Sequence, residues 1–346
     1  MIAAAVSCLL YAYINGFHDA SNVISTIVVS RSLAVGRAIF LACAAQICGV
    51  FLLGTGVAAT MGRGVVRFDM ARLTSPAVIQ VVVLAAMGSA ILWNLATWIL
   101  RMPSSSSHAL VGGLTGASLM AFGPAFVDWN NLLFKVVLVL FASPPLGFLA
   151  GWVGHRLLVR LVRDMHPRIN HTVKRLQTAF LFLLAMSQSS NDVQKSTGLL
   201  AALLLYSGLA SSFTVPWWAT LCCAALFTLG FLTGGTRILR TVGRKIYDVR
   251  PIHSLSAQIS ACSIIVISSV LGGPVSSTQI INAAIVGVGS AERKNAVNWQ
   301  TVKRILVSWA GTIPAAAAIA ALLTRLLMLI VGEGLADVVV QAGFAG

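Results

Sequence analysis

The amino-acid sequence predicts an all-α polytopic membrane protein, and two observations carry this prediction. Of the 346 residues, 58% are hydrophobic and only 10% are charged, with a mean hydropathy of +0.89. A soluble domain has about 25% charged residues, so this chain lacks the polar surface that would face water. The apolar residues also form long runs, such as 78–100 and 314–331. Each run is close to the roughly 20 residues with which a helix crosses the hydrocarbon core of a bilayer.

The apolar runs place the helices in order along the chain, separated by short polar connectors. We expect helical segments at residues 2–29, 38–61, 77–100, 103–123, 131–154, 176–209, 214–236, 254–272, 274–290 and 305–331. The six cysteines lie in apolar stretches and show neither metal-ligand nor disulfide spacing. This pattern indicates a packing role for them and no metal site.

The formal net charge is +15, and the positions of the basic residues explain it. They gather in the connectors 155–175, 237–250 and 292–304, as the positive-inside rule expects of cytoplasmic loops. A basic groove with interleaved aromatic residues, which would suit nucleic acid, does not occur in the sequence. We therefore expect a multi-pass protein of the cell (inner) membrane whose surroundings are the lipid bilayer, with no nucleic acid as a partner.

Two polar motifs occur twice and in the same order. Asn15, His18, Asp19 and Asn22 correspond to Gln188, Asn191, Asp192 and Lys195, at a constant offset of 173 residues. The run 103–108, Pro-Ser-Ser-Ser-Ser-His, corresponds to 274–279, Pro-Val-Ser-Ser-Thr-Gln, at an offset of 171 residues. Paired motifs at nearly the same separation indicate an internal duplication, as in many secondary transporters.

The duplication divides the chain into three parts. These are a first transmembrane repeat, 1–154, a basic cytoplasmic connector, 155–175, and a second transmembrane repeat, 176–346. With the basic connectors in the cytoplasm, a first repeat of inverted topology requires the N-terminus outside, and Arg31 and Arg37 then lie inside, as the rule expects. The three arginines of 62–75 would then lie outside, against the positive-inside rule. Despite this conflict, we predict two inverted-topology repeats with broken helices and re-entrant half-helix hairpins.

The first motif places a carboxylate deep in the membrane. Asn15, Asp19, Asn22 and Thr26 follow helical spacing and share one face. A charged side chain at the bilayer centre costs about 2.5–3.5 kcal/mol on insertion scales. Two of the nine acidic residues, Asp19 and Asp192, nevertheless occupy equivalent positions there. They suit a cation or proton site, and the alternative is a pair of structural carboxylates that cap broken helices.

Two further ionisable side chains accompany these carboxylates. Lys195 stands where the first half has Asn22, and its ammonium can either neutralise Asp192 or attract an anionic substrate. His18, next to Asp19, is a residue type that changes charge near neutral pH, so it suits a proton carrier. A structural histidine explains His18 equally well.

The second motif predicts a site for an oxyanion. Proline suits the first turn of a helix, and the hydroxyl residues that follow it suit the cap positions. The N–H groups of a helix start carry partial positive charge and bind anions. Two such starts that meet at the midplane would hold a small tetrahedral anion, such as phosphate or sulfate. The alternative is ordinary packing of Ser and Thr between membrane helices.

His108, which follows the serines, would also suit a hydrolase. The second copy has Gln279 in its place, and the serines form a row rather than one activated nucleophile. We therefore expect no catalytic residues and a transporter rather than an enzyme.

Taken together, the motifs resemble the inorganic phosphate transporter (PiT) family. The likeness rests on 16–22 (Gly-Phe-His-Asp-Ala-Ser-Asn), 190–195 (Ser-Asn-Asp-Val-Gln-Lys) and the paired Pro-x-Ser-Ser-Ser/Thr-His/Gln segments. It covers essentially the whole chain and looks most like the bacterial low-affinity phosphate permeases. The resemblance implies a symporter of inorganic phosphate with a coupling cation, H⁺ or Na⁺, and no cofactor. It also suggests a homodimer.

The motifs and the resemblance together assign expected roles by position. The expected substrate-binding residues are Asn22, Ser105, Ser106, Ser107, Asn191, Ser276, Ser277 and Thr278. The expected ion-coupling residues are Asp19, Asp192, His18 and Lys195.

One departure from the family pattern bears on the coupling ion. Sodium-coupled members usually have a glutamate in the second segment and in its counterpart, where this chain has Gln46 and Gln258. The loss of both carboxylates favours proton coupling, with or without a metal–phosphate complex as the transported species. A sodium-coupled phosphate symporter and a sulfate permease of the same family are the alternatives.

Overall fold

The structure is a computed structural model that describes residues 1–67, 76–100, 102, 104–166, 168–234, 247 and 249–331. Several expectations of the sequence fall outside these residues. They concern Pro103, most of the connector 237–250, part of the stretch 62–75, and the end of the second repeat, 332–346. Across the described residues the chain is almost entirely helical, and its one β feature is an isolated bridge between Val66 and Val127. The predicted all-α class is confirmed.

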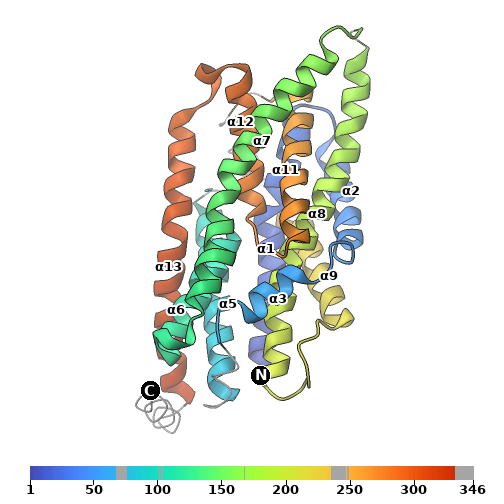
Figure 1. Cartoon of the computed structure of the whole chain (residues 1–346). Helices are drawn as coiled ribbons and strands as arrows, with labels where there is room; N and C mark the ends of the chain where they lie inside the picture. Colours follow the sequence, from blue (N-terminus) through green and yellow to red (C-terminus); the bar gives the residue numbers. More distant parts are fainter. Residues whose placement is uncertain are drawn as a thin grey trace.

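The helices follow one another along a single elongated bundle (Figure 1). In chain order they are α1 (Ile2–Val29), α2 (Val35–Gly49), α3 (Gly56–Arg63), α5 (Pro76–Ile99), α6 (Ser106–Phe122), α7 (Leu138–Val162), α8 (Ile169–Tyr206), α9 (Trp217–Gly234), α11 (Pro251–Val270), α12 (Ser277–Glu292) and α13 (Trp299–Val331). Short 3₁₀ turns at Pro124–Phe126 and Lys294–Ala296 precede the last long helix of each half, and a π-helical turn, Asn131–Val137, leads into α7.

The distribution of polarity is that of a membrane protein. Within the described part of the chain, five helical stretches are long and apolar enough to cross a bilayer: Pro76–Ile99, Asn131–Val162, Trp217–Gly234, Pro251–Val270 and Trp299–Val331. Large apolar side chains cover the outside, such as Phe40 at 77% and Ile330 at 79% exposed, whereas many polar side chains are buried. A surface of this kind is stable against lipid and not against water.

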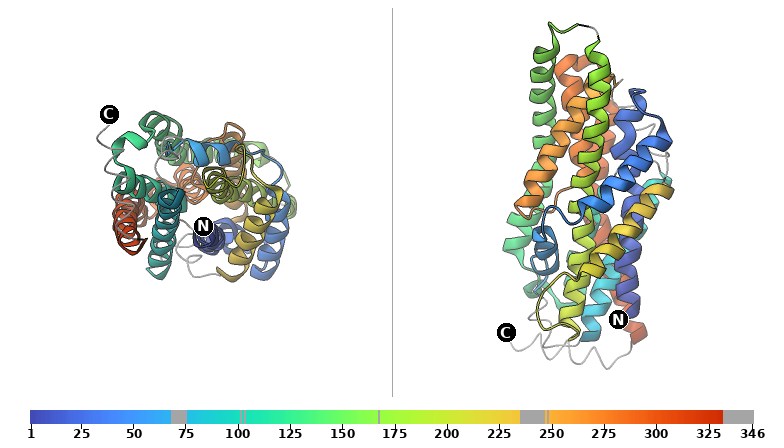
Figure 2. Two further views of the ribbon diagram at one scale, coloured as in Figure 1. Left: turned by 90° about the horizontal axis from the view of Figure 1, so that it is seen from below. Right: turned by 90° about the vertical axis from the view of Figure 1, so that its right-hand side faces the viewer.

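Two expected segments have different boundaries in the structure. The segment 38–61 is split, because α2 ends at Gly49 and α3 begins only at Gly56, after Gly54 with a positive φ of 70°. Most of the basic connector 155–175 is helical, since α7 continues to Val162 and α8 begins at Ile169. Arginine and lysine favour helices, and these two helices extend beyond the others at one end of the molecule (Figure 2).

The helices that carry the first motif are continuous. Both α1 and α8 run unbroken through their polar patches, over 28 and 38 residues. The interruptions that the sequence leads us to expect lie instead between α2 and α3 and at the turns before α6 and α12. Since the polar side chains of the patches can bond to neighbouring elements, the backbone of α1 and α8 keeps its own hydrogen bonds.

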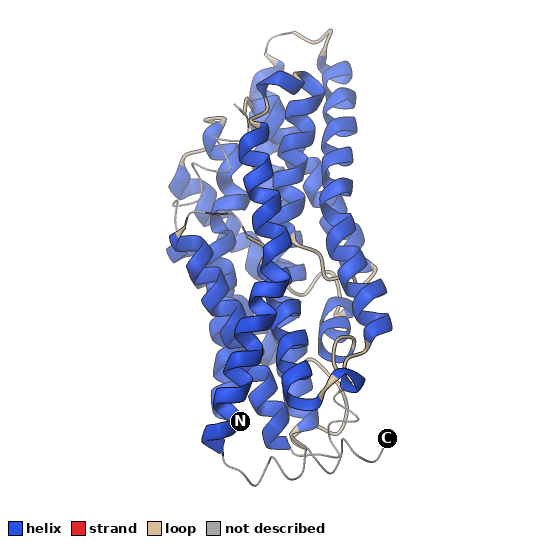
Figure 3. Cartoon of the chain, turned by 90° about the vertical axis from the view of Figure 1, so that its left-hand side faces the viewer, coloured by secondary structure: helices blue, strands red, loops and turns tan. Residues whose placement is uncertain are grey.

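Two hairpins reverse direction inside the bundle. One is formed by α5 and α6 and the other by α11 and α12, and they enter from opposite ends (Figure 1). Their tips meet, because the Ser105 hydroxyl lies 2.8 Å from the Ser276 hydroxyl. Figure 3 shows loop segments among the helices near mid-height, a level at which the backbone of a membrane protein is normally regular. Such irregular backbone is tolerated at membrane depth only when protein surrounds it.

Each half packs one of its short helices against the last long helix of the other half. The half-helix α6 packs on α13 of the other half, and α12 packs on α7. Both contacts use glycine: a Cβ added to Gly116 would lie 2.1 Å from the Ala317 carbonyl oxygen, and one added to Gly151 would lie 2.4 Å from that of Ala284. In Figure 1 the equivalent helices α1 and α8 run in opposite directions. These features agree with a duplicated chain, and the inverted arrangement of the repeats in the membrane stays a prediction.

Candidate functional site

Four segments converge in the interior of the bundle: the middles of α1 and α8 and the two hairpin tips, which include the first turns of α6 and α12. All twelve residues predicted from the sequence lie in these segments, and none is more than 4% exposed. The site is therefore enclosed by protein on all sides.

On the α1 side, Asp19 connects the first half to the tip of α12. Its Oδ1 accepts a 2.7 Å hydrogen bond from the Thr278 hydroxyl. The Asn22 amide lies 3.1 Å from the same hydroxyl and 3.5 Å from Asp19 Oδ1. His18 completes the cluster, with Nδ1 3.0 Å from Asp19 Oδ1. Helical spacing brings Asp19 and Asn22 onto one face, as the sequence predicts.

On the α8 side, Asp192 binds both a hydroxyl and an ammonium. Its Oδ2 accepts a 2.7 Å hydrogen bond from Ser277, and its Oδ1 accepts one from Lys195 Nζ. Lys195 also donates to the Ser107 hydroxyl and to the Val275 carbonyl, each at 2.7 Å. The ammonium is therefore the neutralising partner of Asp192, one of the two roles that the sequence leaves open for it.

The two tips present helix starts to the same interior region. Ser105 caps α6 by accepting from the His108 N–H, and Ser276 caps α12 by accepting from the Gln279 N–H. Among the described residues, the N–H groups of the next residues, Ser106, Ser107, Ser277 and Thr278, have no acceptor. The Ser106 hydroxyl is buried and also has no partner in the part of the chain that the structure describes. This arrangement offers several hydrogen-bond donors to an anion.

Asn191 uses its amide nitrogen to hold the α11–α12 hairpin, and its role in substrate binding stays a prediction. Its amide donates to the Ser269 hydroxyl at 2.8 Å and to the Gly273 carbonyl at 3.2 Å. These bonds connect α8 to the α11–α12 turn, so the amide nitrogen positions the tip. The side-chain oxygen has no partner among the described residues.

Thr97 and Tyr11 lie outside the sequence motifs, and Ser104 belongs to the run 103–108 but is not among the expected site residues. Thr97 and Ser104 each lie 3.4 Å from His18 Nε2, and the Tyr11 hydroxyl donates to the Ser106 carbonyl at 3.0 Å. Tyr11 could have been found, because it precedes Asn15 by four residues on the same helical face. Thr97 lies in an apolar helix and gives no such signal.

The serine–histidine pair does not form a catalytic site. The Ser105 hydroxyl lies 2.6 Å from His108 Nδ1 but also caps α6 and contacts Ser276. The His108 ring packs edge-on against Phe141, at 5.5 Å between centroids, rather than against an orienting carboxylate. The geometry therefore lacks the third group that orients a general base.

Gln46 and Gln258 are buried, and the side-chain amides of both have no partner among the described residues. Gln46 lies on α2, and its backbone carbonyl accepts a 2.9 Å hydrogen bond from Ser189 on α8. Both residues are neutral at positions where the resemblance leads us to expect carboxylates in sodium-coupled proteins.

A separate cluster joins α7, α11 and α12 near the end of α12. His155 and His253 each place Nε2 3.1 Å from Glu292 Oε2, and these three side chains could be considered as metal ligands. However, His253 Nδ1 accepts the Arg250 N–H at 3.1 Å. The proton of a neutral His253 is therefore on Nε2, where it donates to Glu292 and blocks a metal bond. The cluster fastens three helices together.

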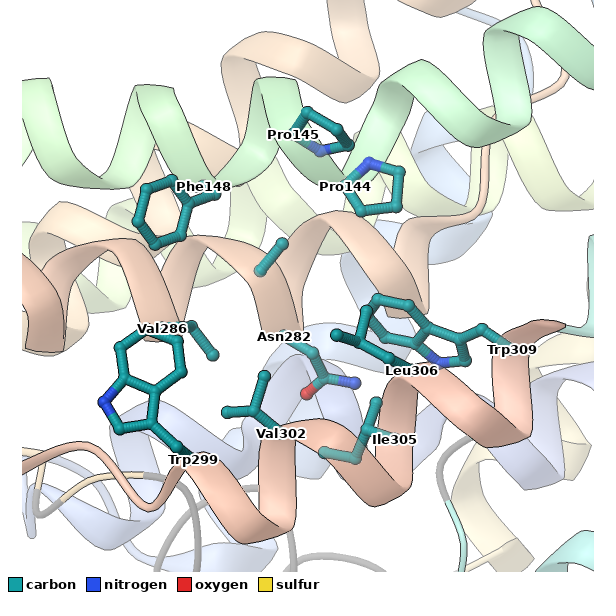
Figure 4. A pocket seen from close by; sticks show the side chains of 11 residues that line it. Pro144, Pro145, Phe148, Asn282, Val286, Trp299, Val302, Ile305, Leu306 and Trp309 are labelled. Carbon is teal, nitrogen blue, oxygen red and sulfur yellow. The ribbon is translucent and has the colours of Figure 1, made fainter.

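An apolar cavity of about 240 Å³ lies apart from the polar site, between α7, α12 and α13. Its walls include Phe148, Trp299 and Leu306. Figure 4 shows the Asn282 side chain among these apolar groups. Asn282 is buried, and neither atom of its amide has a partner among the described residues.

A closed polar site inside an apolar helical bundle, with buried carboxylates and two hairpin tips, defines the class of membrane transporters. Within that class, the model of the phosphate transporter family matches residues 15–167 and 162–320, which together cover most of the chain and both halves. The chain belongs to the phosphate transporter family.

Relatives across bacteria agree with this assignment. The chain is 38% identical to the probable low-affinity inorganic phosphate transporter of Rhizobium meliloti, over 93% of the chain and 95% of that protein. It is 35% identical to the protein of the same name from Bacillus subtilis, with the same coverage. A solved structure described as the sodium-dependent phosphate transporter has a TM-score of 0.86, with 24% identity, over 95% of this chain and 99% of that one. At this identity the structural likeness supports the fold alone.

Proposed function

We propose that this chain is a secondary active symporter that carries inorganic phosphate across the cell membrane together with protons. Membership of the phosphate transporter family and the names of its bacterial relatives support phosphate as the substrate. The proposed phosphate ligands are the hydroxyls and N–H groups at the two tips: Ser105, Ser106, Ser107, Ser276, Ser277 and Thr278. Phosphate oxygens suit these donors because two helix starts supply partial positive charge.

The observation that carries this proposal is that two neighbouring hydroxyls at the start of α12 donate hydrogen bonds to two different carboxylates. Ser277 donates to Asp192 and the adjacent Thr278 donates to Asp19, both at 2.7 Å. A proton or cation that binds Asp19 weakens the hydrogen bond that Asp19 accepts from the Thr278 hydroxyl. This hydroxyl can then turn toward phosphate. Cation binding and anion binding would thus favour each other, as symport requires.

The charges at the site support proton coupling. Lys195 already neutralises Asp192, so Asp19 is the carboxylate that is available to a mobile cation. Gln46 and Gln258 add no negative charge. We further propose His18, 3.0 Å from Asp19, as a group through which a proton can reach that carboxylate.

Two other functions are supported by specific observations. Sodium coupling is favoured by the oxygen atoms of Asp19, Asn22 and Thr278, since hard cations bind oxygen ligands. Sulfate has the same tetrahedral shape as phosphate and would suit the same donors. A neutral metal–phosphate complex would carry less charge into the site, so it belongs with the proton-coupled mechanism.

The experiment is uptake of labelled phosphate by the purified protein in proteoliposomes, under an imposed pH gradient or an imposed sodium gradient. We expect the pH gradient to drive accumulation without sodium, and unlabelled sulfate to compete poorly. Repeating the assay with and without Mg²⁺ distinguishes free phosphate from a metal complex. A strict requirement for sodium would exclude the proton mechanism, and efficient competition by sulfate would favour a sulfate permease.

We also propose an orientation and an assembly. The protein would lie in the cell (inner) membrane with its basic connectors in the cytoplasm, and the two repeats would expose the site alternately to each side. The resemblance to the family suggests a homodimer. Cross-linking of the protein in native membranes and labelling of single cysteines from either side test these two statements.

A further inference from the structure

Lys195 is held by oxygen atoms from three different segments. The Ser107 hydroxyl of the first-half tip and the Val275 carbonyl of the second-half tip each lie 2.7 Å from its Nζ. Asp192 on α8 provides the third contact through Oδ1. The side chain of Lys195 is fully buried, so these contacts lie away from bulk solvent.

These three partners fix the charge of the amine. The Ser107 hydroxyl gives its own hydrogen to the Val275 carbonyl, at 3.0 Å, and therefore accepts from Lys195. The carbonyl and the carboxylate oxygen are also acceptors. With Asp192 ionised, the three acceptors require three N–H groups, which only the ammonium form of Lys195 provides. Lys195 is a cation enclosed by oxygens, as a bound metal cation would be.

The equivalent position in the first half is neutral. Asn22 precedes Lys195 by the repeat offset of 173 residues, and its amide nitrogen lies 3.1 Å from Thr278, the counterpart of Ser107. Its side-chain oxygen is buried and accepts no hydrogen bond from any described residue. Together with Asp19 Oδ1 and Thr278 Oγ1, this oxygen provides ligands for a cation, and the ionisable side chain beside Asp19, His18, is a cation only when protonated.

We propose that the Lys195 ammonium is a tethered cation, which occupies beside Asp192 the position that a mobile coupling cation occupies beside Asp19. This inference rests on the proposed function and adds the number and place of the coupling ions. A tethered cation neutralises Asp192 throughout the transport cycle and is never released. The second half then needs no cation from solution, so one mobile cation accompanies each phosphate, bound in the first half.

The decisive variant is Lys195→Asn, because it makes the second half a copy of the first. A cation from solution must then enter beside Asp192 before the tips can close. We expect phosphate uptake by this variant to fall about 10-fold or more at low cation concentration and to recover as H⁺, Na⁺ or Li⁺ is raised. The Hill coefficient for the cation should rise from about 1 in the wild type towards about 2.

A binding measurement makes this test independent of transport. Without phosphate, Na⁺ or Li⁺ should raise the unfolding temperature of the purified Lys195→Asn variant more than that of the wild type, because a bound ligand stabilises the folded state. The matched control is the double variant Asp192→Asn/Lys195→Asn, which removes both charges. It should show no additional stabilisation by the cation and a Hill coefficient of about 1.

Three results would overturn the inference. They are unchanged cation dependence of uptake in Lys195→Asn, no additional cation stabilisation of that variant, and two mobile cations per phosphate in the wild type. The wild-type stoichiometry decides the question if the variant does not insert into the membrane. A wild type that takes up no phosphate, with a variant that cations stabilise more strongly, would refute the proposed function and leave the tethered cation standing.

Discussion

The hydroxyl of Thr278 donates a 2.7 Å hydrogen bond to the Asp19 carboxylate, across 259 residues of sequence. This bond joins the start of α12, in the second half, to the middle of α1, in the first. Because the same hydroxyl accepts from the Asn22 amide, it also links the two polar residues of α1. A movement of the α11–α12 hairpin must therefore break or remake contacts to the carboxylate that we propose for ion coupling.

Replacing Thr278 with valine keeps the shape of the side chain and removes this hydrogen bond. Hydrogen bonds to charged groups contribute about 1.5–3 kcal/mol, so the loss of the hydroxyl that turns toward phosphate should weaken phosphate binding about 10- to 100-fold. Titration of uptake against phosphate concentration measures the change. Thr324→Val is the matched control, since the Thr324 hydroxyl is buried and donates to the Ala320 carbonyl within α13. Equal effects of the two substitutions would contradict a specific role for Thr278.

Neutralising the two aspartates should have different consequences. Asp19→Asn removes the proposed site of the mobile cation, so we expect loss of phosphate uptake while the protein stays folded in the membrane. Asp192→Asn leaves the Lys195 ammonium buried without its counter-charge, which destabilises a protein by about 3–5 kcal/mol. Uptake and thermal unfolding of both variants distinguish the two effects.

Asp164→Asn is the control for these variants, because Asp164 is exposed beyond the end of α7. Wild-type uptake by both the Asp19 and the Asp192 variants would disprove the proposed site. Lower stability of Asp19→Asn than of Asp192→Asn would show that the two carboxylates have been assigned the wrong environments.

Much of this site could be predicted from the sequence, because most of its polar residues lie in short local motifs. The spacing of Asp19 and Asn22 fixes their common face, and the paired hydroxyl runs predict two helix starts. What could not be predicted is which tip contacts which carboxylate. Thr278 contacts Asp19 in the other half, whereas Ser277 contacts Asp192 in its own, and only the packed structure decides between these pairings.

The fold shows the same limit. Apolar runs locate most helices to within a few residues, but hydrophobicity alone does not show where the backbone breaks. The run 38–61 is apolar throughout and yet is interrupted between α2 and α3, whereas the polar patches of α1 and α8 leave their helices intact. In each case tertiary contacts, rather than local composition, decide whether backbone groups are satisfied.

The close contact between α6 and α13 should not tolerate even a methyl group at Gly116. A Cβ there would lie 2.1 Å from the Ala317 carbonyl oxygen, so Gly116→Ala must separate the two helices. Overpacking of this kind typically costs about 1–3 kcal/mol, and we expect a lower unfolding temperature in detergent. Gly311→Ala in α13 is the control, because a Cβ at Gly311 would meet nothing within 4 Å. A stable Gly116 variant would show that the helices can separate without cost.

Restoring carboxylates at Gln46 and Gln258 should change the coupling ion. Each amide is buried without a partner among the described residues, and a carboxylate there needs a cation for compensation. We expect uptake by the double variant Gln46→Glu/Gln258→Glu to be stimulated by sodium, compared with little effect in the wild type. Uptake measured with sodium or choline as the external cation tests this expectation. A sodium-independent double variant would mean that these positions do not set ion selectivity.

The cavity between α7, α12 and α13 allows a test that separates stability from transport. The Asn282 amide lies against an apolar cavity of about 240 Å³, and neither of its polar atoms has a partner among the described residues. An unsatisfied buried polar group costs about 1–3 kcal/mol. Asn282→Leu removes that cost and adds apolar contacts to Trp309 and Ile305, which also line the cavity. We therefore expect a higher unfolding temperature in detergent and unchanged phosphate uptake.

Asn282→Asp, of similar size but charged, should have the opposite effect on stability, because an ionised group has no compensation there. If Asn282→Leu instead abolishes uptake in a protein that is at least as stable, the amide takes part in the movement of α12, and the cavity is part of the transport cycle.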